Sequence, residues 1–284
     1  MAEAVEIVEV GPRDGLQNQA RIIPTDRKVA LVDALSEAGF QRIEVASFVS
    51  PRWVPQMADG AEVLVGIGRR PGTRYMALAP NLKGYEAARA DGADEVAVVT
   101  AASEGFARAN LNATVAETLD RIATILDMAH RDEMPVRGYV SVVTDCPYDG
   151  EVAPASVARV SAALRDLGCH EVSLGETLGR GTPERVDAML RAVLEELPPE
   201  RLAGHFHDTS GRALENVEVA LGHGLRVFDS SVGGLGGCPF APGAAGNVAT
   251  EALAERLATL GYETALDREA LARATALARS LREG

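Results

Sequence analysis

The sequence alternates short apolar, β-branched runs with segments of helical periodicity over almost its whole length. The apolar runs are, in order, Val5–Val10, Arg42–Phe48, Thr73–Ala79, Glu95–Ala101, Val136–Val143, Glu171–Gly175, Leu202–His207 and Val227–Val232. Runs that are apolar at nearly every position are typical of parallel strands buried on both faces. Parallel neighbours need a crossover, usually a helix, between consecutive strands. The pattern therefore predicts eight strand-then-helix units.

The segments between these runs carry an apolar stripe at helical spacing. In Asp26–Ala38, for example, Val29, Val32 and Leu35 fall on one face, and Gly39 follows as a residue suited to end a helix. The other amphipathic segments are Leu82–Ala90, Val115–His130, Ser156–Leu167, Glu184–Leu197, Leu214–Leu221 and Val248–Leu260.

Eight such units in about 250 residues match the size of a TIM barrel. No linker or low-complexity tract divides the chain, so we expect residues 1–284 to form a single (β/α)8 domain. The alternative is a doubly wound sheet, but it would usually show a glycine-rich dinucleotide fingerprint after its first strand, and Gly11–Gly15 is not one. Asp267–Arg282 predicts one extra C-terminal helix, which could cap the barrel or pack on a partner subunit.

Charge and cysteine content exclude several classes of protein. The net charge of −13 argues against nucleic acid or an anionic membrane as a partner, and no apolar run approaches the roughly 18 residues of a membrane span. The acidic start, Met1–Ala4, enters a strand at once, so we expect no signal or transit peptide. Three widely spaced cysteines (Cys146, Cys169 and Cys238) favour free thiols in a reducing cytoplasm.

Two histidines end the seventh apolar run. His205 and His207 are two residues apart, so in a strand both rings point to the same face. Two imidazoles make half of a metal site, and Asp14, beside Arg13 at the end of the first run, offers an oxygen ligand. Taken alone, a His-x-His pair is compatible with ordinary surface or core histidines.

Other polar residues also fall at the ends of the predicted strands. This is where TIM barrels carry their active sites, and buried carboxylates and imidazoles are costly unless they are paired or bind a metal. The residues are Asp14, Glu44, Ser47, Glu176, His205, His207 and the segment Asp229-Ser230-Ser231.

The most specific segment is Ser230–Phe240, in which four glycines precede Cys238. Such a loop can approach a ligand closely. An inert cysteine on a flexible turn is the alternative. A second loop, Cys146–Gly150, follows the fifth predicted strand and could face the same end of the barrel.

At these motifs the sequence resembles the 3-hydroxy-3-methylglutaryl-CoA (HMG-CoA) lyases. Ser231–Phe240 matches the signature of that family, and the likeness extends over nearly the whole chain. It includes Val8–Asn18, Ser47–Pro51, Trp53–Met57, Pro80–Gly84, Arg137–Ser141 and Gly246–Glu251, of which the last matches at all positions but Val248. The family consists of TIM-barrel enzymes that cleave a 3-hydroxyacyl-CoA into acetyl-CoA and a keto acid with a divalent metal.

The resemblance implies a role for individual residues. Asp14, His205, His207 and Asn247 would bind the metal, and this donor set suits Mg²⁺ or Mn²⁺ better than a structural zinc. Arg13 would stabilise the enolate at the thioester oxygen, and Cys238 would take part in proton transfer. Glu44 and Glu176 would be further catalytic groups, and Gln17, Ser47 and Tyr148 would bind substrate together with Arg13.

Several of these residues have simpler alternatives. Asn247 could cap the helix that follows it, and Arg13 could serve only as the partner of Asp14. Glu44 and Glu251 resemble supporting carboxylates of the family, and structural roles are equally open for both. A thiol at Cys238 suits proton transfer only if its surroundings lower its pKa.

Two residues depart from the pattern of the best-known family members. Glu176 stands where aspartate is usual, and Ser210 stands where tyrosine is usual. One methylene moves a carboxylate by roughly 1.5 Å, enough to disturb how a substrate is held. The departures put the acyl group in doubt, but not the type of reaction.

With this resemblance, the sequence predicts a cytoplasmic, metal-dependent carbon–carbon lyase that acts on an acyl-CoA thioester. We expect it to serve leucine catabolism and to assemble as a homodimer or higher homo-oligomer. A lyase for citramalyl-CoA or a longer 3-substituted 3-hydroxyglutaryl-CoA is the nearest alternative. A Claisen-condensing synthase shares the barrel and the His-x-His pair but fits the cysteine loop less well. A Schiff-base aldolase needs a lysine inside the barrel, and Lys28 and Lys83 are expected elsewhere. A non-catalytic acyl-CoA-binding protein would have no use for the combined metal, arginine and cysteine set.

Overall fold

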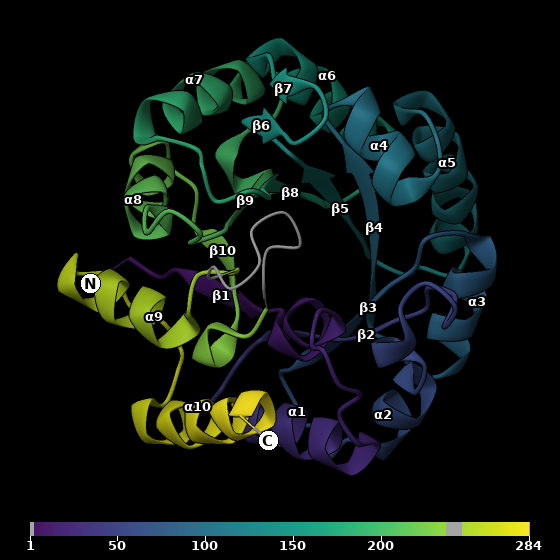
Figure 1. The fold of residues 1–284 in the computed structure, drawn as a ribbon, viewed down its shortest axis with the longest axis vertical. Coiled ribbons are helices and arrows are strands. Elements are labelled where there is room, and N and C mark those ends of the chain that lie inside the picture. The colour runs from purple at the N-terminus through teal and green to yellow at the C-terminus, as the bar shows by residue number, and fades with distance from the viewer. Residues whose placement is uncertain (1–2, 237–245, 284) are drawn as a thin grey trace.

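The protein is a closed barrel of eight parallel strands, seen down its axis in Figure 1. The computed structural model describes residues 3–236 and 246–283. The barrel strands are β1 (Glu6–Glu9), β2 (Arg42–Ser47), β3 (Arg74–Leu78), β4 (Glu95–Ala101), β5 (Val136–Ser141), β8 (Glu171–Glu176), β9 (Leu202–Phe206) and β10 (Val227–Ser230). Each pairs in parallel with its neighbours, and β1 closes the ring between β2 and β10. The (β/α)8 prediction is confirmed.

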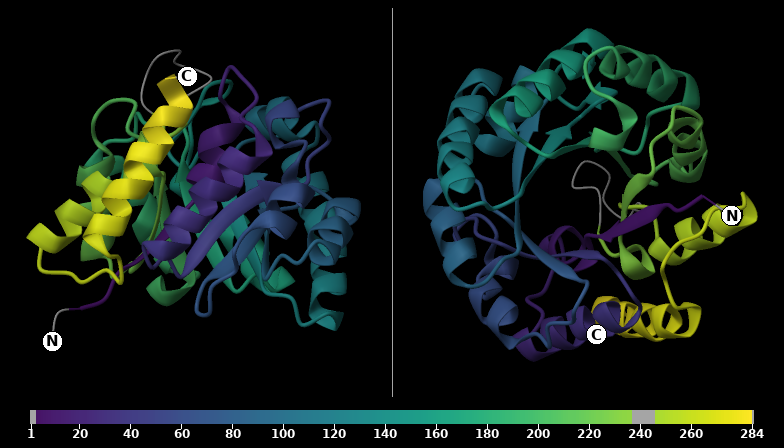
Figure 2. Two further views of the ribbon diagram at one scale, coloured as in Figure 1. Left: turned by 90° about the horizontal axis from the view of Figure 1, so that it is seen from below. Right: turned by 180° about the vertical axis from the view of Figure 1, so that it is seen from behind.

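Helices surround this barrel, as both views of Figure 2 show. They are α1 (Thr25–Glu37), α2 (Gly60–Gly66), α3 (Leu82–Ala90), α4 (Glu104–Leu111), α5 (Val115–Arg131), α6 (Pro154–Leu167), α7 (Pro183–Leu194), α8 (Ala213–Gly222), α9 (Thr250–Thr259) and α10 (Arg268–Glu283). The extra C-terminal helix α10 is confirmed; it lies against α1 and is drawn in yellow beside it in Figure 2.

Two helices and one pair of short strands were not predicted. The helix α2 has only seven residues with glycine at both ends, so it is too short to show a helical period. Helix α4 ends at Asn112 in a left-handed conformation, directly before α5. Between β5 and α6, the two-residue strands β6 (Asp145–Cys146) and β7 (Gly150–Glu151) form an antiparallel pair that is separate from the barrel.

Strand alternation separates two apolar layers. Val8, Val10, Met76, Leu78, Ala97 and Tyr139 form a cluster inside the barrel, and the larger core lies between the strands and the helices. Residues of alternate parity along a strand therefore face either the barrel interior or the helix layer. This rule decides which polar residues can meet at the site.

The amino-terminal end of the barrel interior is filled by paired charges. Arg137, fully buried on β5, donates to Glu171 at 2.6 Å and to Asp229 at 2.8 Å. Arg42 donates two further hydrogen bonds to Glu171, at 2.9 and 3.1 Å. Buried charges need such partners, since an unpaired one would be costly.

In the described part of the chain, no helix is long and apolar enough to cross a membrane.

Candidate metal centre

Two imidazoles converge at the carboxyl end of β9. His205 and His207 are each 8% exposed, and their Nε2 atoms lie 3.3 Å apart. Ligand atoms of Asp14, His205 and His207 all lie within 4.8 Å of one another. These three side chains thus form a group that could hold a metal ion, and the predicted convergence of Asp14 with the histidines is confirmed.

Asp14 reaches this point through an unusual turn. Residues Gly11–Gly15 form a single π-helical turn directly after β1, in which the Asp14 amide donates to the Val10 carbonyl at 2.7 Å. The Asp14 carboxylate accepts hydrogen bonds from Arg13 at 2.5 Å, Gln17 at 2.8 Å and Asn247 at 2.8 Å. Burial favours the neutral acid, but the charge of Arg13 and the hydrogen bond from Asn247 act against it, and the Asp14 pKa is lowered.

Asn247 is held beside His207 by backbone pairing. Residues 246–250 run between the ends of β9 and β10: Val248 N donates to Phe206 O at 3.1 Å, and Ser231 N donates to Val248 O at 3.0 Å. His207 and Asn247 form a bridge in this arrangement. Because the Asn247 amide nitrogen donates to Asp14, its oxygen is the atom left for a metal. Asn247 lies before Ala249, the N-cap of α9, so it is not the cap itself.

Arg13 lies between two carboxylates under an aromatic ring. Its Nε donates to Glu44 Oε2 at 2.8 Å, and Tyr139 OH donates to the same oxygen at 3.2 Å. The guanidinium carbon is 5.6 Å from the centre of the Tyr139 ring. Burial would lower the pKa of Arg13, but the charges of Glu44 and Asp14 raise it above its ordinary value, so Arg13 stays charged. Glu44 fixes the arginine, as a supporting carboxylate would.

Asp229 stands behind His205. Its Oδ2 lies 3.0 Å from His205 Nδ1 and accepts from Ser173 Oγ at 2.8 Å, while Oδ1 accepts from Arg137. A carboxylate accepts, so Nδ1 carries a proton, and Nε2 is the nitrogen left to bind a metal at the centre. Burial would raise the pKa of Asp229, but Arg137 and His205 hold it well below its usual range.

The two rings differ in their protonation. Burial acts to lower the pKa of His205, but the hydrogen bond and the charge of Asp229 outweigh it and raise this pKa above its ordinary value. Burial, with His205 close by, lowers the pKa of His207 to about 4, so His207 is neutral near pH 7. Among the described residues, the buried Nδ1 of His207 has no hydrogen-bond partner. Two imidazole nitrogens, a carboxylate and an amide oxygen converging on one point are the donor set of a divalent cation such as Mg²⁺ or Mn²⁺.

The other predicted substrate-binding residues differ in their burial and their contacts. The side-chain amide of Gln17 donates a hydrogen bond to Asp14. Ser47 is buried at the end of β2, and its hydroxyl has no hydrogen-bond partner among the described residues. Tyr148 is 54% exposed on the turn between β6 and β7. In the same turn the buried Cys146 Sγ accepts from the Tyr148 and Asp149 amides. Cys238 lies outside the described residues.

Glu176 is placed differently from the histidines. It pairs with Phe206 in the register of β8 and β9, and it has the parity of Val172 and Leu174, which face the helix layer. Its Oε1 accepts from Thr144 Oγ1 at 3.1 Å and from the Arg180 amide at 3.2 Å, inside the loop before α7. Burial raises the Glu176 pKa. The contacts described for it support this loop and not the metal centre.

Tyr139 was not predicted as a site residue, and Asp229 was noted only as the start of a loop. Both have the parity of inward-facing residues on their strands, which is a signal that the sequence carries once the strands are known. The partners that they contact come from other strands of the ring, Glu44 from β2 and His205 from β9.

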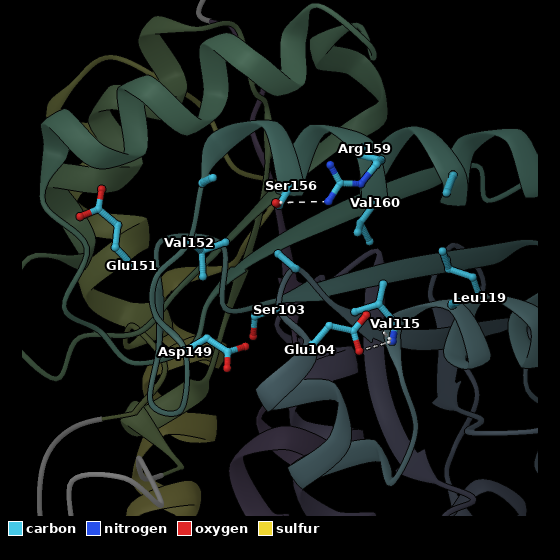
Figure 3. A pocket seen from close by; sticks show the side chains of 14 residues that line it. Ser103, Glu104, Val115, Leu119, Asp149, Glu151, Val152, Ser156, Arg159 and Val160 are labelled. Atoms are coloured by element: carbon cyan, nitrogen blue, oxygen red, sulfur yellow. Dashed lines mark hydrogen bonds between the residues drawn. The ribbon is translucent and has the colours of Figure 1, made fainter.

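A separate cavity of about 590 Å³ lies outside the barrel wall, between α5 and α6 (Figure 3). Glu104, Asp149, Glu151 and Arg159 line it together with small and β-branched side chains. Figure 3 shows Arg159 turned to Ser156 and Glu104 turned to the Val115 amide. None of the predicted site residues lines this cavity.

Comparison with known proteins decides the family. The sequence model of the HMGL-like family matches residues 4–278. The chain belongs to the HMGL-like family. A curated HMGL-like relative from Pseudomonas aeruginosa, named 3-hydroxy-3-isohexenylglutaryl-CoA/hydroxy-methylglutaryl-CoA lyase, is 54% identical over 95% of this chain and 90% of its own length.

Solved structures agree with this assignment to the HMGL-like family. The crystal structure of an HMG-CoA lyase from Brucella melitensis matches with a TM-score of 0.99 at 57% identity, covering 100% of both chains. An HMG-CoA lyase from Acinetobacter baumannii, solved with coenzyme A and 3-methylmalate, matches with a TM-score of 0.93 at 38% identity, covering 98% of this chain and 91% of the other.

Proposed function

We propose that this protein is a carbon–carbon lyase that cleaves HMG-CoA to acetyl-CoA and acetoacetate with the help of a divalent metal. The observation that carries the proposal is the convergence of Asp14, His205 and His207 beside the buried Arg13. Family membership and the names of relatives that are more than half identical over nearly the whole chain support it.

The donor set fits the metal that the resemblance implies. Asp14, His205, His207 and Asn247 would hold Mg²⁺ or Mn²⁺, with Asp229 fixing the His205 ring. When bound, the ion supplies a positive charge that makes the C3 hydroxyl of the substrate more acidic and orients it. The structure fixes no preference between the two metals.

The residues of the chain account for the remaining steps. The C3 hydroxyl gives up its proton to a base, the C2–C3 bond breaks, and C3 becomes the ketone of acetoacetate. The electron pair of the broken bond enters the thioester as an enolate. Arg13, held by Glu44 and Asp14, donates hydrogen bonds to the enolate oxygen, and a proton from Cys238 at the enolate carbon completes acetyl-CoA. The proton that the base took from the C3 hydroxyl then restores the Cys238 thiol, so the overall reaction neither consumes nor releases a proton.

A second substrate is supported by one comparison. The relative from Pseudomonas aeruginosa is named for both the isohexenyl and the methyl compound. A lyase for a longer 3-substituted 3-hydroxyglutaryl-CoA, or for citramalyl-CoA, uses the same steps on another acyl group. A condensing synthase would run the carbon–carbon step in reverse and remains the less favoured candidate.

The proposal is tested by product analysis. The purified protein is incubated with a panel of 3-hydroxy-dicarboxyl-CoA thioesters, with Mg²⁺, with Mn²⁺ and with EDTA, and the products are identified by mass spectrometry. We expect acetyl-CoA and acetoacetate from HMG-CoA with either metal, and a loss of both with EDTA. Cleavage of none of the thioesters would contradict a lyase function, and full activity in EDTA would contradict the metal.

Three finer expectations from the sequence stay predictions. They are a cytoplasmic location, a role in leucine catabolism, and assembly as a homodimer or higher homo-oligomer. Light scattering after size-exclusion chromatography measures the last of these directly.

A further inference from the structure

The strongest unassigned feature is a buried carboxylate behind the wall of the barrel. Glu9 is the last residue of β1 and is fully buried. Its parity is that of Val5 and Ile7, so it faces the helix layer and not the site. Figure 1 shows β1, β10 and α9 side by side at this place. The proposed mechanism gives Glu9 no role.

Three segments donate hydrogen bonds to this single carboxylate. Oε1 accepts from the Gly11 amide at 2.8 Å and from the Val232 amide at 2.9 Å. Oε2 accepts from Thr250 Oγ1 at 2.7 Å. Burial raises the Glu9 pKa to about 7, although each of the three hydrogen bonds lowers it.

Each donor lies a few residues from a group of the proposed site. Gly11 opens the turn that carries Arg13 and Asp14, and Thr250 follows Asn247 by three residues. Val232 opens the glycine-rich segment in which Cys238 lies. The three donors therefore link Glu9 to segments that come from opposite ends of the sequence.

The same segments are also packed without room for side chains. A Cβ at Gly11 would lie 2.6 Å from Glu9 Oε1, and a Cβ at Gly15 would lie 2.7 Å from Leu235 Cβ. The turn after β1 therefore packs closely against the segment 231–236. A shift of one segment must displace the other.

We propose that Glu9 is a positioning residue that holds the turn 11–15 and the segments 231–236 and 246–250 in register, and so keeps Asp14 and Asn247 at hydrogen-bond distance beside the histidines. This role rests on the proposed metal centre. It is exerted through backbone position, because Glu9 itself faces away from the centre.

The test compares two substitutions at Glu9 by Mn²⁺ binding, measured by electron paramagnetic resonance and calorimetry on the full chain. Glu9→Gln keeps the length and an oxygen for both amides, and its NH₂ group can donate to Thr250. Glu9→Asp is one methylene too short to reach all three donors. We expect Glu9→Gln to bind Mn²⁺ within about threefold of the wild type, and Glu9→Asp to bind at least about tenfold more weakly, with kcat reduced about 100-fold.

A matched control separates this role from a general loss of stability. Glu95 is also a fully buried glutamate, at the first position of β4 and the opposite end of the barrel, where it contacts His170 at 2.8 Å. Glu95→Asp should lower the melting temperature without changing Mn²⁺ affinity. The proposal is overturned if folded Glu9→Asp binds Mn²⁺ as tightly as the wild type. It is also overturned if Glu95→Asp or Glu9→Gln weakens Mn²⁺ binding as much as Glu9→Asp does.

A second variant covers the case in which Glu9→Asp does not fold. Thr250→Val removes one of the three donors and preserves the shape of the side chain. Its control is Thr118→Val, which removes a buried hydroxyl that lies away from the site and is 2.6 Å from the Thr100 hydroxyl. We expect Thr250→Val to weaken Mn²⁺ binding about threefold or more, and Thr118→Val to leave it unchanged. Equal Mn²⁺ affinity in the two variants overturns the proposal. If the wild type binds no Mn²⁺, the metal centre itself is wrong and Glu9 has no such role.

Discussion

At the scale of single residues, the site depends on how neighbours set the state of each functional group. Asp229 fixes the protonated nitrogen of His205, and burial keeps His207 neutral. Arg13 is kept charged and oriented by Glu44 and Asp14. The chemistry thus comes from pairs of residues, and a single substitution is expected to disturb a partner as well.

The histidine pair gives the first prediction. His207→Ala removes one of the two imidazole donors, so we expect Mn²⁺ affinity to fall by orders of magnitude and nearly all activity to be lost. The fold should survive, because His207 Nδ1 has no partner among the described residues. Metal content after gel filtration and a circular dichroism melt check both statements. Full metal occupancy in the variant would remove His207 from the ligand set.

The thiol gives the second prediction. Cys238→Ser replaces the thiol by a hydroxyl, which is a much poorer proton donor and acceptor near neutral pH. We expect kcat to fall by orders of magnitude and the affinity for the substrate to change little. Steady-state kinetics together with binding of a non-cleavable acyl-CoA analogue measure both. Unchanged turnover would make Cys238 an inert loop residue.

At the scale of elements, the site is assembled by the segments that follow the strands. The π-helical turn after β1 presents Arg13 and Asp14, and residues 246–250 pair with the ends of β9 and β10 to bring in Asn247. The loop after β8 is supported from behind by Glu176, and the Ser210 amide donates to Gly179 O at 3.0 Å, which joins this loop to the one after β9.

This arrangement gives the third prediction, on acyl specificity. Because the Glu176 carboxylate accepts hydrogen bonds from Thr144 and from the Arg180 amide of its loop, Glu176→Asp should lower thermal stability. It should leave the ratio of kcat/KM for HMG-CoA over the isohexenyl analogue within about threefold of the wild type. Ser210→Tyr, alone and combined with Glu176→Asp, tests whether the space beside Ser210, on the loop after β9, sets this ratio of kcat/KM values. One misfitting methylene is worth about 1–3 kcal/mol, so a change of tenfold or more with Glu176→Asp alone would show that Glu176 contacts the acyl group.

At the scale of the whole molecule, paired charges inside the barrel join opposite walls. Glu171 on β8 accepts from Arg137 on β5 and from Arg42 on β2. Burial acts against the charged form of Glu171, but the two arginines lower its pKa to about 2 from an ordinary value of 4.5. Glu171 therefore binds its proton less readily in the folded state than in the unfolded state.

The fourth prediction is the resulting acid limit of stability. The folded pKa is depressed, so the contribution of Glu171 is complete above pH 4.5 and is lost as the pH falls toward 2. A shift of this size corresponds to about 3 kcal/mol. Urea unfolding at a series of pH values should show this loss in the wild type. Glu171→Gln should be less stable near pH 6, because both arginines lose a charged partner, and its stability should vary less between pH 4.5 and 2.

The sequence by itself determined the architecture and half of the site. The eight apolar runs and the stripes between them are local patterns, and they predicted the barrel, the extra helix α10 and the shared face of His205 and His207. The proximity of Arg13 and Asp14 in the chain pointed to the same end of the barrel. Such features follow from the periods of strands and helices, which a short window of sequence contains.

The tertiary structure alone decided which residues stand behind these groups. Asp229 meets His205, Tyr139 meets Glu44, and Glu9 accepts hydrogen bonds from residues that are more than 200 positions away in sequence. It also placed the Glu176 carboxylate against Thr144 and the Arg180 amide, in the loop before α7. The physical reason is that closing the ring fixes the register between strands, and only that register determines which side chains share the interior and which lie behind it.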